Sequence, residues 1–307
     1  MASLEAAPTA GETKIVHTGC CHDCGGRCAL HVHVKDGVIV RIETDGGSGT
    51  QYRACARGRA YRQRVYHPDR LKYPLKRIGE RGEGSFTRIS WDEALDTVAS
   101  ELRRVKETYG PSAILFWAGS GNQGSIHGGL RIGELLLHHG GYTQGWGGAS
   151  FEGSLFASMA SYGTIRTGDS RDNLLLSKLI VLWGWNPANT IWDTNTSLYL
   201  ARAREAGIRI VGVDPICTDT IAAFARQWVP IRPGTDAAAL IAMAYVLIDE
   251  NLHDQAFLDR YTVGFPRYRD YVLGVADGVP KTPRWAEGIT GVPAATIAQL
   301  ARDYATA

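Results

Sequence analysis

Four cysteines near the start of the chain constrain its fold more than any other feature. Three lie on one short segment and the fourth follows at a distance, as Cys20, Cys24, Cys28 and Cys55 with the spacing C-x3-C-x3-C-x26-C. A cubane iron–sulfur cluster takes one thiolate per iron, which suits a tight loop closed by one distant cysteine. Zinc ribbons more often provide two paired C-x2-C knuckles. The spacing therefore favours a [4Fe–4S] cluster over zinc or unligated thiols.

One ligand position stays open at this point. Cys21 and Cys24 are also separated by a spacing that metal sites use, so either Cys20 or Cys21 can supply the first thiolate. Spacing alone does not choose between these two neighbours.

The composition is that of a folded, soluble chain with room for two domains. Of its 307 residues 44% are hydrophobic and 21% are charged, which excludes a disordered chain, and no apolar stretch approaches the length that crosses a bilayer. The net charge of +2 gives no reason to expect nucleic acid. Five of the six cysteines precede residue 56, which indicates a local ligand set and not a secreted disulfide framework. Residues 1–14 carry no export signal, which predicts a cytoplasmic protein unless a signal has been trimmed.

After the cysteine loop the sequence predicts a β-hairpin. Residues 30–34 alternate between apolar side chains and the two histidines His31 and His33, which is the pattern of a half-buried strand. Asp36-Gly37 predicts a tight turn into a second strand, residues 38–42. We interpret the histidines as solvent-facing strand residues in preference to metal ligands.

From residue 89 the chain alternates helices and strands. The run Ser90–Glu93 predicts a capping box at the start of a helix that ends at Gly110-Pro111. Alternating strands and helices then predict a parallel, doubly wound α/β sheet. The predicted strands are 113–117, 179–183 and 208–213, and the predicted helices are 130–137, 198–206, 237–249, 255–261 and 293–304. The expected fold class is thus α/β, with a small β-rich iron–sulfur domain over residues 1–75 and a cofactor-binding region over residues 76–307.

The loops at the carboxyl ends of these strands are the expected place for cofactor contacts, because open parallel sheets bind ligands there. Residues 119–124 have the form G-x-G-x-x-G, which lets backbone N–H groups approach a pyrophosphate but is weak evidence alone. No acidic residue ends a second strand at the spacing of a nicotinamide site. Ordinary turn chemistry is the alternative for each loop taken singly. The candidate cofactor-binding residues are Gly119, Gly121, Gly184, Asn186, Pro187, Thr190, Asp214, Arg232, Gly234 and Asp236.

Arginines crowd the segment after the last of the four cysteines. A ligated cluster and a pyrophosphate are both anionic, and nearby cations stabilise both. A solvated basic face is the alternative, and a nucleic-acid surface is disfavoured because exposed aromatics are not interleaved with the basic residues. The arginines are Arg57, Arg59, Arg62, Arg64, Arg70 and Arg77.

Together these motifs resemble the molybdopterin oxidoreductases of the dimethyl sulfoxide reductase family, from about His17 to the end of the chain. The resemblance implies that Cys20, and not Cys21, is the first cluster ligand. It also implies that Arg57 is the basic residue between the cluster and a pterin. The likeness is carried by Cys55-Ala-Arg57-Gly-Arg59 and by residues 65–74, 81–84, 89–94, 184–187, 213–215 and 232–236.

The resemblance further implies a molybdenum site, or tungsten in some members. The metal of that family is held by two pterin guanine dinucleotides and one protein side chain, which corresponds to Ser150, beyond the landmark Gly140-Gly141-Tyr142. A serine ligand is typical of sulfoxide and N-oxide reductases and implies oxygen-atom transfer. Two departures bear on this: Gly148-Ala149 stand where the family usually has Asp-Tyr, and Ile216 stands where it usually has arginine. The alternative for Ser150 is a loop serine that caps the helix near Phe151.

The resemblance also implies partners and a longer enzyme. Electrons would arrive through the cluster from an iron–sulfur subunit, with a membrane anchor subunit beside it. Because family members are much longer, we expect an N-terminal fragment that is inactive alone. The alternatives are another enzyme of the family (a hydroxyl transferase or hydratase), an electron-transfer subunit without molybdenum, or a zinc-stabilised binding module.

Overall fold

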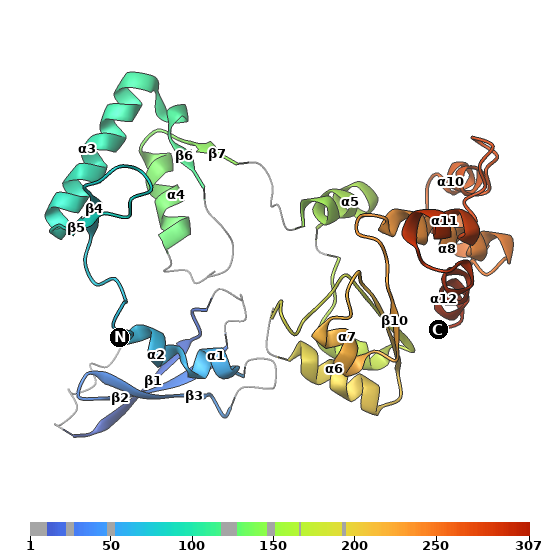
Figure 1. Ribbon diagram of the computed structural model, residues 1–307, viewed down its shortest axis with the longest axis horizontal. Coiled ribbons are helices and arrows are strands. Elements are labelled where there is room, and N and C mark those ends of the chain that lie inside the picture. The colour runs from blue at the N-terminus through green and yellow to red at the C-terminus, as the bar shows by residue number, and fades with distance from the viewer. Residues whose placement is uncertain are drawn as a thin grey trace. The chain divides into compact units, whose positions relative to one another are not determined.

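The structure is a computed structural model that describes residues 11–22, 28–47, 53–117, 128–145, 151–165, 167–191 and 195–307. The chain divides into two compact units, Met1–Gly168 and Asp169–Ala307, each with a hydrophobic core of its own. Figure 1 labels most of their helices and strands. Among the described residues no helix is both long enough and apolar enough to cross a lipid bilayer.

The first unit begins with an antiparallel sheet in the order β1-β2-β3. The predicted hairpin is confirmed: Asp36 and Gly37 have positive φ angles of 49° and 78°, which is the backbone of a two-residue turn that matches the twist of its strands. Leu30 and Val32 are buried on one face. The strands are β1 (Thr13–Gly19), which the sequence did not predict, β2 (Ala29–Lys35) and β3 (Val38–Thr44).

The two histidines of β2 alternate with the buried residues and pair with carboxylates. His33 Nε2 lies 2.8 Å from Glu43 Oε2 on β3, and His31 Nε2 lies 3.3 Å from Asp45 Oδ1 just beyond it. The ring of His17 on β1 meets the ring of His31 edge-on, with the centroids 4.4 Å apart. These contacts connect the three strands on that face.

Two short helices, α1 (Ala56–Arg59) and α2 (Tyr61–Val65), pack on β3. A small hairpin, β4 (Leu75–Arg77) with β5 (Phe86–Arg88), leads into α3 (Trp91–Tyr109). The predicted start and end of α3 are confirmed, the end at Gly110 with φ 84°.

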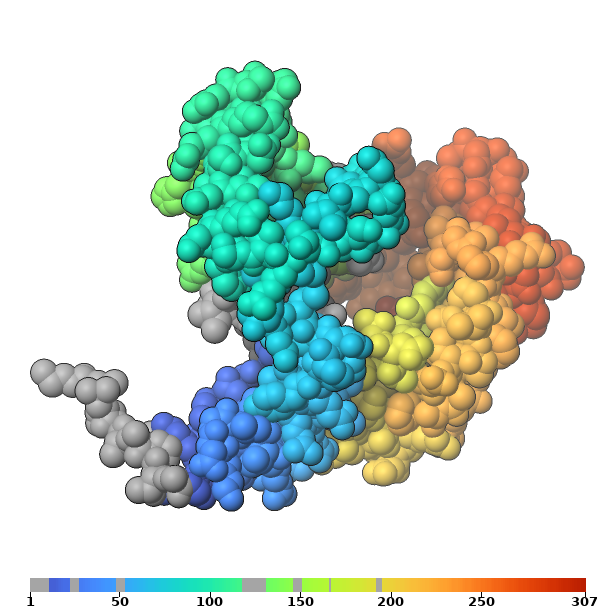
Figure 2. Space-filling view, turned by 60° about the vertical axis from the view of Figure 1, so that its left-hand side comes forward, coloured from blue at the N-terminus to red at the C-terminus, as the bar shows by residue number. Residues whose placement is uncertain are grey.

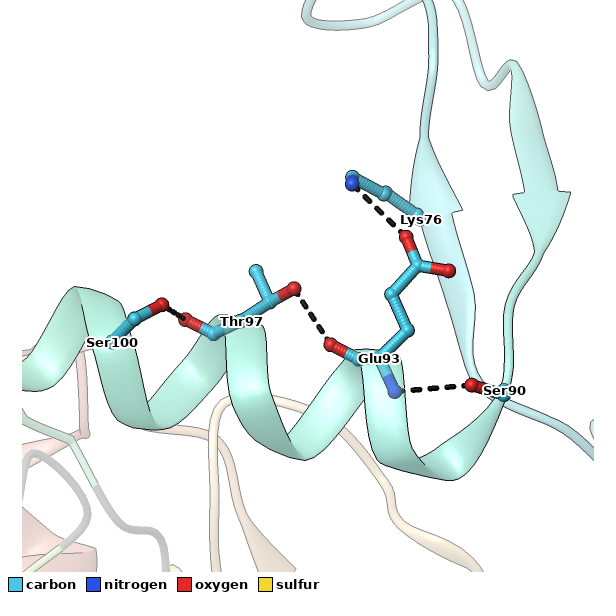
Figure 3. A network of polar contacts seen from close by, with 5 residues as sticks. All are labelled: Lys76, Ser90, Glu93, Thr97 and Ser100. Atoms are coloured by element: carbon cyan, nitrogen blue, oxygen red, sulfur yellow. Dashed lines mark hydrogen bonds and ion pairs between the residues drawn. The ribbon is translucent and has the colours of Figure 1, made fainter.

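The start of α3 uses one half of the predicted capping box. Ser90 Oγ accepts the Glu93 N–H at 3.0 Å, but the Glu93 carboxylate lies 3.1 Å from Lys76 Nζ on β4 (Figure 3). In the same view, the Thr97 and Ser100 hydroxyls each donate to a carbonyl of the preceding turn. Glu93 therefore ties the helix to the hairpin.

The remainder of the first unit differs from the sequence prediction in its strands, and its last helix was not predicted. The strand expected over 113–117 is shorter, because Pro111–Ala113 form a turn of 3-10 helix directly after Gly110. The strand β6 (Leu115–Phe116) pairs in parallel with β7 (Thr143–Gln144) in a two-stranded sheet of its own, not with the later strands. The helices here are α4 (Gly128–His138) and α5 (Glu152–Tyr162).

The second unit contains a parallel sheet in the order β10-β9-β8 with helices on both faces, as the predicted doubly wound architecture requires. Ile180, Leu182 and Ile210 pack on one face with residues of α6. Val211 and Val213 pack on the other face with residues of α8, α11 and α12. The elements are η3 (Arg171–Leu176), β8 (Leu179–Trp183), α6 (Thr196–Glu205), β9 (Arg209–Val213), α7 (Asp219–Phe224) and β10 (Gln227–Val229), of which η3, α7 and β10 were not predicted.

Five helices complete the second unit and include the three predicted there. Figure 2 shows them in orange to red, and α8 contacts α10, α11 and α12. Their bounds are α8 (Asp236–Asp249), α9 (Gln255–Tyr261), α10 (Phe265–Val272), α11 (Pro283–Thr290) and α12 (Ala294–Thr306).

Candidate metal and cofactor sites

Cys55 stands at the start of α1, where backbone N–H groups turn toward its sulfur. Burial raises the pKa of the Cys55 thiol, but hydrogen bonds from the N–H groups of Gly58 and Arg57 and from the Arg57 guanidinium outweigh burial, so the pKa is lowered. The thiolate is the form of cysteine that binds a metal. This position therefore suits a cluster ligand, and Arg57 contacts the predicted ligand directly.

Cys20 and Cys28 lie at the end of β1 and just before β2. The Cys20 N–H donates to the Cys28 carbonyl at 2.7 Å, and Cys28 is only 3% exposed. α1 approaches this pair closely: a Cβ added to Gly58 would lie 3.5 Å from Cys20 Sγ and 3.3 Å from Ala54 Cβ. Glycine at position 58 thus brings the helix that follows Cys55 against Cys20.

Three of the four predicted cluster ligands therefore belong to one small region. Cys24 lies outside the described residues. Within the described residues no three His, Cys, Asp or Glu side chains gather closely enough to hold a metal ion. The cysteines that the structure describes, among them Cys20, Cys28 and Cys55, are not joined in disulfides.

Cys21 has a different surrounding from its neighbour. The pKa of Tyr61, at the start of α2, is raised first by hydrogen bonding with the Cys21 side chain and then by burial. Cys20 instead packs against the core that contains Cys28. Sequence reasoning missed Tyr61. Its only indication of a role at this site was its position in the arginine-rich segment after Cys55.

At the other candidate site, the sheet register brings three loops to one edge. Trp183 pairs with Val213, and Val213 with Val229, so the chain leaves β8, β9 and β10 at the same end of the sheet. Gly184, with φ 58°, donates its N–H to the Val213 carbonyl at 2.9 Å. The predicted segments that contain Gly184, Asp214 and Arg232 therefore leave the same edge of the sheet, the edge at which parallel sheets bind dinucleotides.

The loop after β8 is held by a set of hydrogen bonds. The Asn186 carbonyl accepts the N–H groups of Asn189 and Thr190, at 3.1 and 2.9 Å. The Asn186 side-chain oxygen accepts the Thr220 hydroxyl at 2.6 Å, and the Thr220 oxygen accepts the Ala188 N–H at 3.0 Å. Thr220 on α7 is fully buried and was missed from sequence, because it lies far along the chain from the loop it holds.

The polar residues of the other two loops also have partners within the protein. Asp214 Oδ1 accepts the Ile216 N–H at 3.1 Å, and Asp236 Oδ1 accepts the indole N–H of Trp183 at 2.8 Å. The Arg232 guanidinium donates to two carbonyls at the end of α11, those of Gly288 at 3.1 Å and Ile289 at 3.2 Å. Gly234 has a positive φ of 75° in the turn between Arg232 and Asp236.

These bonds hold the loops in place, and cofactor contacts by the same residues stay a prediction. The site residues Gly119, Gly121 and Ser150 lie outside the described residues. Pro187 is buried beneath the loop that it stiffens. The residues present fit both expected groups. Cys55 stands where its thiolate is stabilised, as a cluster ligand requires. The loops at one edge of the sheet include Gly184, whose Cα has open space beside it for a dinucleotide.

Comparison with known families assigns the chain to a class. A family model described as molybdopterin oxidoreductase matches residues 70–298, and one described as molybdopterin oxidoreductase Fe4S4 domain matches residues 13–67. The chain therefore belongs to the molybdopterin oxidoreductase family. The cofactors predicted from the sequence, a [4Fe–4S] cluster and molybdenum bis(molybdopterin guanine dinucleotide), are the ones that this membership supports.

Individual relatives give more detail. Dimethyl sulfoxide reductase DmsA of Escherichia coli (strain K12) is 42% identical, over 97% of this chain and 40% of that enzyme. The dimethyl sulfoxide/trimethylamine N-oxide reductase of Rhodobacter capsulatus is 33% identical, over 78% of this chain and 32% of that enzyme. The structure of acetylene hydratase from Pelobacter acetylenicus has a TM-score of 0.65 and 27% identity, over 93% of this chain and 38% of that one. The chain spans about 40% of the length of the curated relatives it matches most extensively.

Proposed function

We propose that this chain is the cluster-binding and part of the cofactor-binding region of a molybdenum enzyme that reduces an S-oxide or N-oxide. The observation that carries the proposal is the 42% identity to a dimethyl sulfoxide reductase over 97% of the chain. A second relative is named for both dimethyl sulfoxide and trimethylamine N-oxide, which supports the same substrate class. When bound, the molybdenum centre would supply oxygen-atom transfer, and the cluster would supply single electrons.

We assign Cys20, Cys24, Cys28 and Cys55 as the cluster ligands. The lowered pKa of Cys55 and the close approach of α1 to Cys20 support this assignment. We assign to Arg57 the role of a cation that stabilises the reduced, more anionic cluster without holding it, because its guanidinium reaches the Cys55 sulfur.

We assign Ser150 as the protein ligand of molybdenum. A hard serine oxygen suits an oxophilic metal. For the dinucleotides we assign the loops around Gly184–Thr190, Asp214 and Arg232–Asp236, which the sheet register brings to one edge. Their internal hydrogen bonds would hold the binding surface in shape before the cofactor arrives.

We also propose that electrons reach the enzyme from an iron–sulfur subunit and that a membrane anchor subunit accompanies it. The similarity to DmsA-type reductases supports both partners. A cytoplasmic location of the chain stays a prediction.

A hydratase is the second candidate function. The structural likeness to acetylene hydratase, at 27% identity, favours it, as does the Gly148-Ala149 departure before Ser150. The higher identity to the reductases favours oxygen-atom transfer over hydration.

The test uses the full-length enzyme, purified without oxygen. We expect iron and molybdenum together, and oxidation of a reduced viologen dye that depends on dimethyl sulfoxide or trimethylamine N-oxide. Hydration of acetylene without dye oxidation would favour the hydratase. Iron without molybdenum would indicate an electron-transfer subunit, and zinc alone would contradict both enzyme assignments.

A further inference from the structure

We propose that a pocket beside α2 in the first unit binds a small phosphate monoester that has an apolar body. The pocket has a volume of about 420 Å³, which lies within the range of small-molecule sites, about 300–1,000 Å³. It uses none of the residues assigned above to the cluster, to molybdenum or to the dinucleotides. Its lining residues are Tyr61, Arg64, His67, Asp69, Arg70 and Leu71.

Two consecutive turns of the chain bring basic side chains to this pocket. The Arg64 carbonyl at the end of α2 accepts the His67 N–H at 3.4 Å, and the His67 carbonyl accepts the Arg70 N–H at 3.1 Å. Pro68 follows His67 and favours such a turn, because its ring fixes φ near the value that the second position of a β-turn requires. Arg64, His67 and Arg70 thus follow one another at intervals of three residues, and all three line the same pocket.

The two arginines of the pocket are available to a ligand. Arg62, also on α2, donates to the Val40 carbonyl at 2.6 Å and is therefore used by the fold. Within the part of the chain that the structure describes, neither Arg64 nor Arg70 forms an ion pair or a side-chain hydrogen bond. The carboxylate in the lining belongs to Asp69, whose side chain is 90% exposed, so solvent screens its charge.

His67 adds a third donor. Its Nδ1 accepts the Asp69 N–H at 3.2 Å, so the proton of the neutral ring lies on Nε2 and can be donated. A phosphate monoester carries close to two negative charges at neutral pH and has three terminal oxygens that accept hydrogen bonds. Two guanidinium groups and one imidazole N–H match that group better than a carboxylate, which has one charge and two oxygens.

The remaining lining is apolar and requires more than a phosphate group to cover it. The Arg64 guanidinium lies 5.6 Å from the centroid of the Tyr61 ring, so a cation and an aromatic surface lie next to each other. Leu71 is 74% exposed. A ligand whose apolar body covers Tyr61 and Leu71 gains from removing this surface from water.

The experiment measures binding of phenyl phosphate to the full-length holoprotein by isothermal titration calorimetry. Inorganic phosphate tests the charged group alone, and benzoate tests a carboxylate on the same aromatic body. The variants are Arg64→Gln, Arg70→Gln and Leu71→Asn. Lys72→Gln is the matched control, because it removes one exposed positive charge next to the pocket in sequence but outside its lining. The iron content of every preparation is measured as a check of the fold.

We expect one phenyl phosphate per chain, bound more tightly than inorganic phosphate or benzoate. Arg64→Gln and Arg70→Gln should each weaken binding by about tenfold or more, the effect of losing a hydrogen bond between charged groups, with unchanged iron content. Leu71→Asn should weaken binding of phenyl phosphate and leave that of inorganic phosphate unchanged. Lys72→Gln should change either affinity by less than about twofold, because an exposed charge outside the site is screened.

Three results would overturn the proposal: no saturable binding of phenyl phosphate, benzoate bound as tightly as phenyl phosphate, or an equal loss of affinity in Lys72→Gln and the two pocket arginine variants. The last result would show a general effect of net charge. Each would leave the proposed function standing, because that function rests on iron, molybdenum and dye oxidation measured without these probes.

Discussion

Arg57 shows how one side chain can serve a cofactor without holding it. Its N–H and guanidinium both favour the thiolate of Cys55, against the effect of burial. Replacing Arg57 by serine keeps the N–H and removes the cation. In the full-length enzyme we expect Arg57→Ser to leave the iron content unchanged, lower the reduction potential of the cluster and slow turnover, as measured by redox titration and steady-state assay. Loss of iron would instead make Arg57 part of the cluster-holding structure.

Asp277 makes folding stability depend on pH. Its hydrogen bond to the buried Lys281, followed by one from the Val279 N–H, lowers the pKa of Asp277 from 3.8. The ionised carboxylate therefore stabilises the folded state above pH 3.8, and this contribution is lost as the pH falls through the lowered pKa. We expect Asp277→Asn to decrease stability at neutral pH and to matter much less in strong acid, as measured by urea unfolding. An equal loss at both pH values would exclude ionisation as the cause.

Single residues also show where sequence reasoning stops. Asp36 and Gly37 reveal their turn locally, because positive φ angles favour those residue types. Arg232 and Asp236 were expected to face a cofactor, yet each has a partner far away in sequence: the end of α11 and the Trp183 indole. A sequence identifies a polar side chain at a loop but does not name the distant carbonyl or indole that it meets.

At the scale of elements, the contributions of the two polar contacts at the start of α3 to stability can be measured separately. Ser90 satisfies a backbone N–H, whereas Glu93 pairs with Lys76 at a site where both side chains are about half exposed. We expect Ser90→Ala to cost about 1 kcal/mol in the free energy of unfolding. Glu93→Gln should cost less, within about 0–1 kcal/mol, because solvent screens an exposed ion pair. Chemical denaturation of both variants tests the order, and a larger cost for Glu93→Gln would contradict it.

Element boundaries were predictable where the chain marks them itself. Gly110 and Gly207 end helices with positive φ, as expected of C-terminal glycines. The strands β1 and β10 were missed because pairing with a neighbour, and not a local pattern, creates them. The strand over 113–117 was placed in the wrong sheet, since the choice of a partner strand depends on packing that the sequence pattern does not contain.

The turn after β8 depends on α7 through one hydroxyl. Thr220→Val keeps the shape but leaves Asn186 Oδ1 and the Ala188 N–H without that partner, at an expected cost of about 1–3 kcal/mol. We also expect a lower molybdenum content, because the loop no longer keeps its shape. Thr290→Val is the matched control: Thr290 is equally buried and makes two similar bonds, but within and just after α11. Equal molybdenum loss in both variants would show a general effect of stability.

At the scale of the whole molecule, the chain has two units with separate cores, and its relatives extend well beyond it. The doubly wound sheet could be predicted because alternating strands and helices admit few arrangements. The extent of the two units could not be predicted, because the boundary after Gly168 depends on which contacts form and not on composition. The predicted division into residues 1–75 and 76–307 accordingly stays a prediction.

The final prediction concerns the enzyme as a whole and rests on Ser150. If this side chain is the protein ligand of molybdenum, Ser150→Ala should retain the dinucleotide cofactor, because the loops of the second unit that are proposed to bind it are unchanged. Reduction of dimethyl sulfoxide or trimethylamine N-oxide should nevertheless be lost, and the molybdenum(V) resonance spectrum should change. Ser154→Ala, on the exposed part of α5, is the control and should leave activity, metal content and spectrum as they were. Normal activity with an unchanged spectrum in Ser150→Ala would place the ligand elsewhere and remove the main residue-level support for oxygen-atom transfer, while the iron–sulfur assignment would stand on its own cysteines.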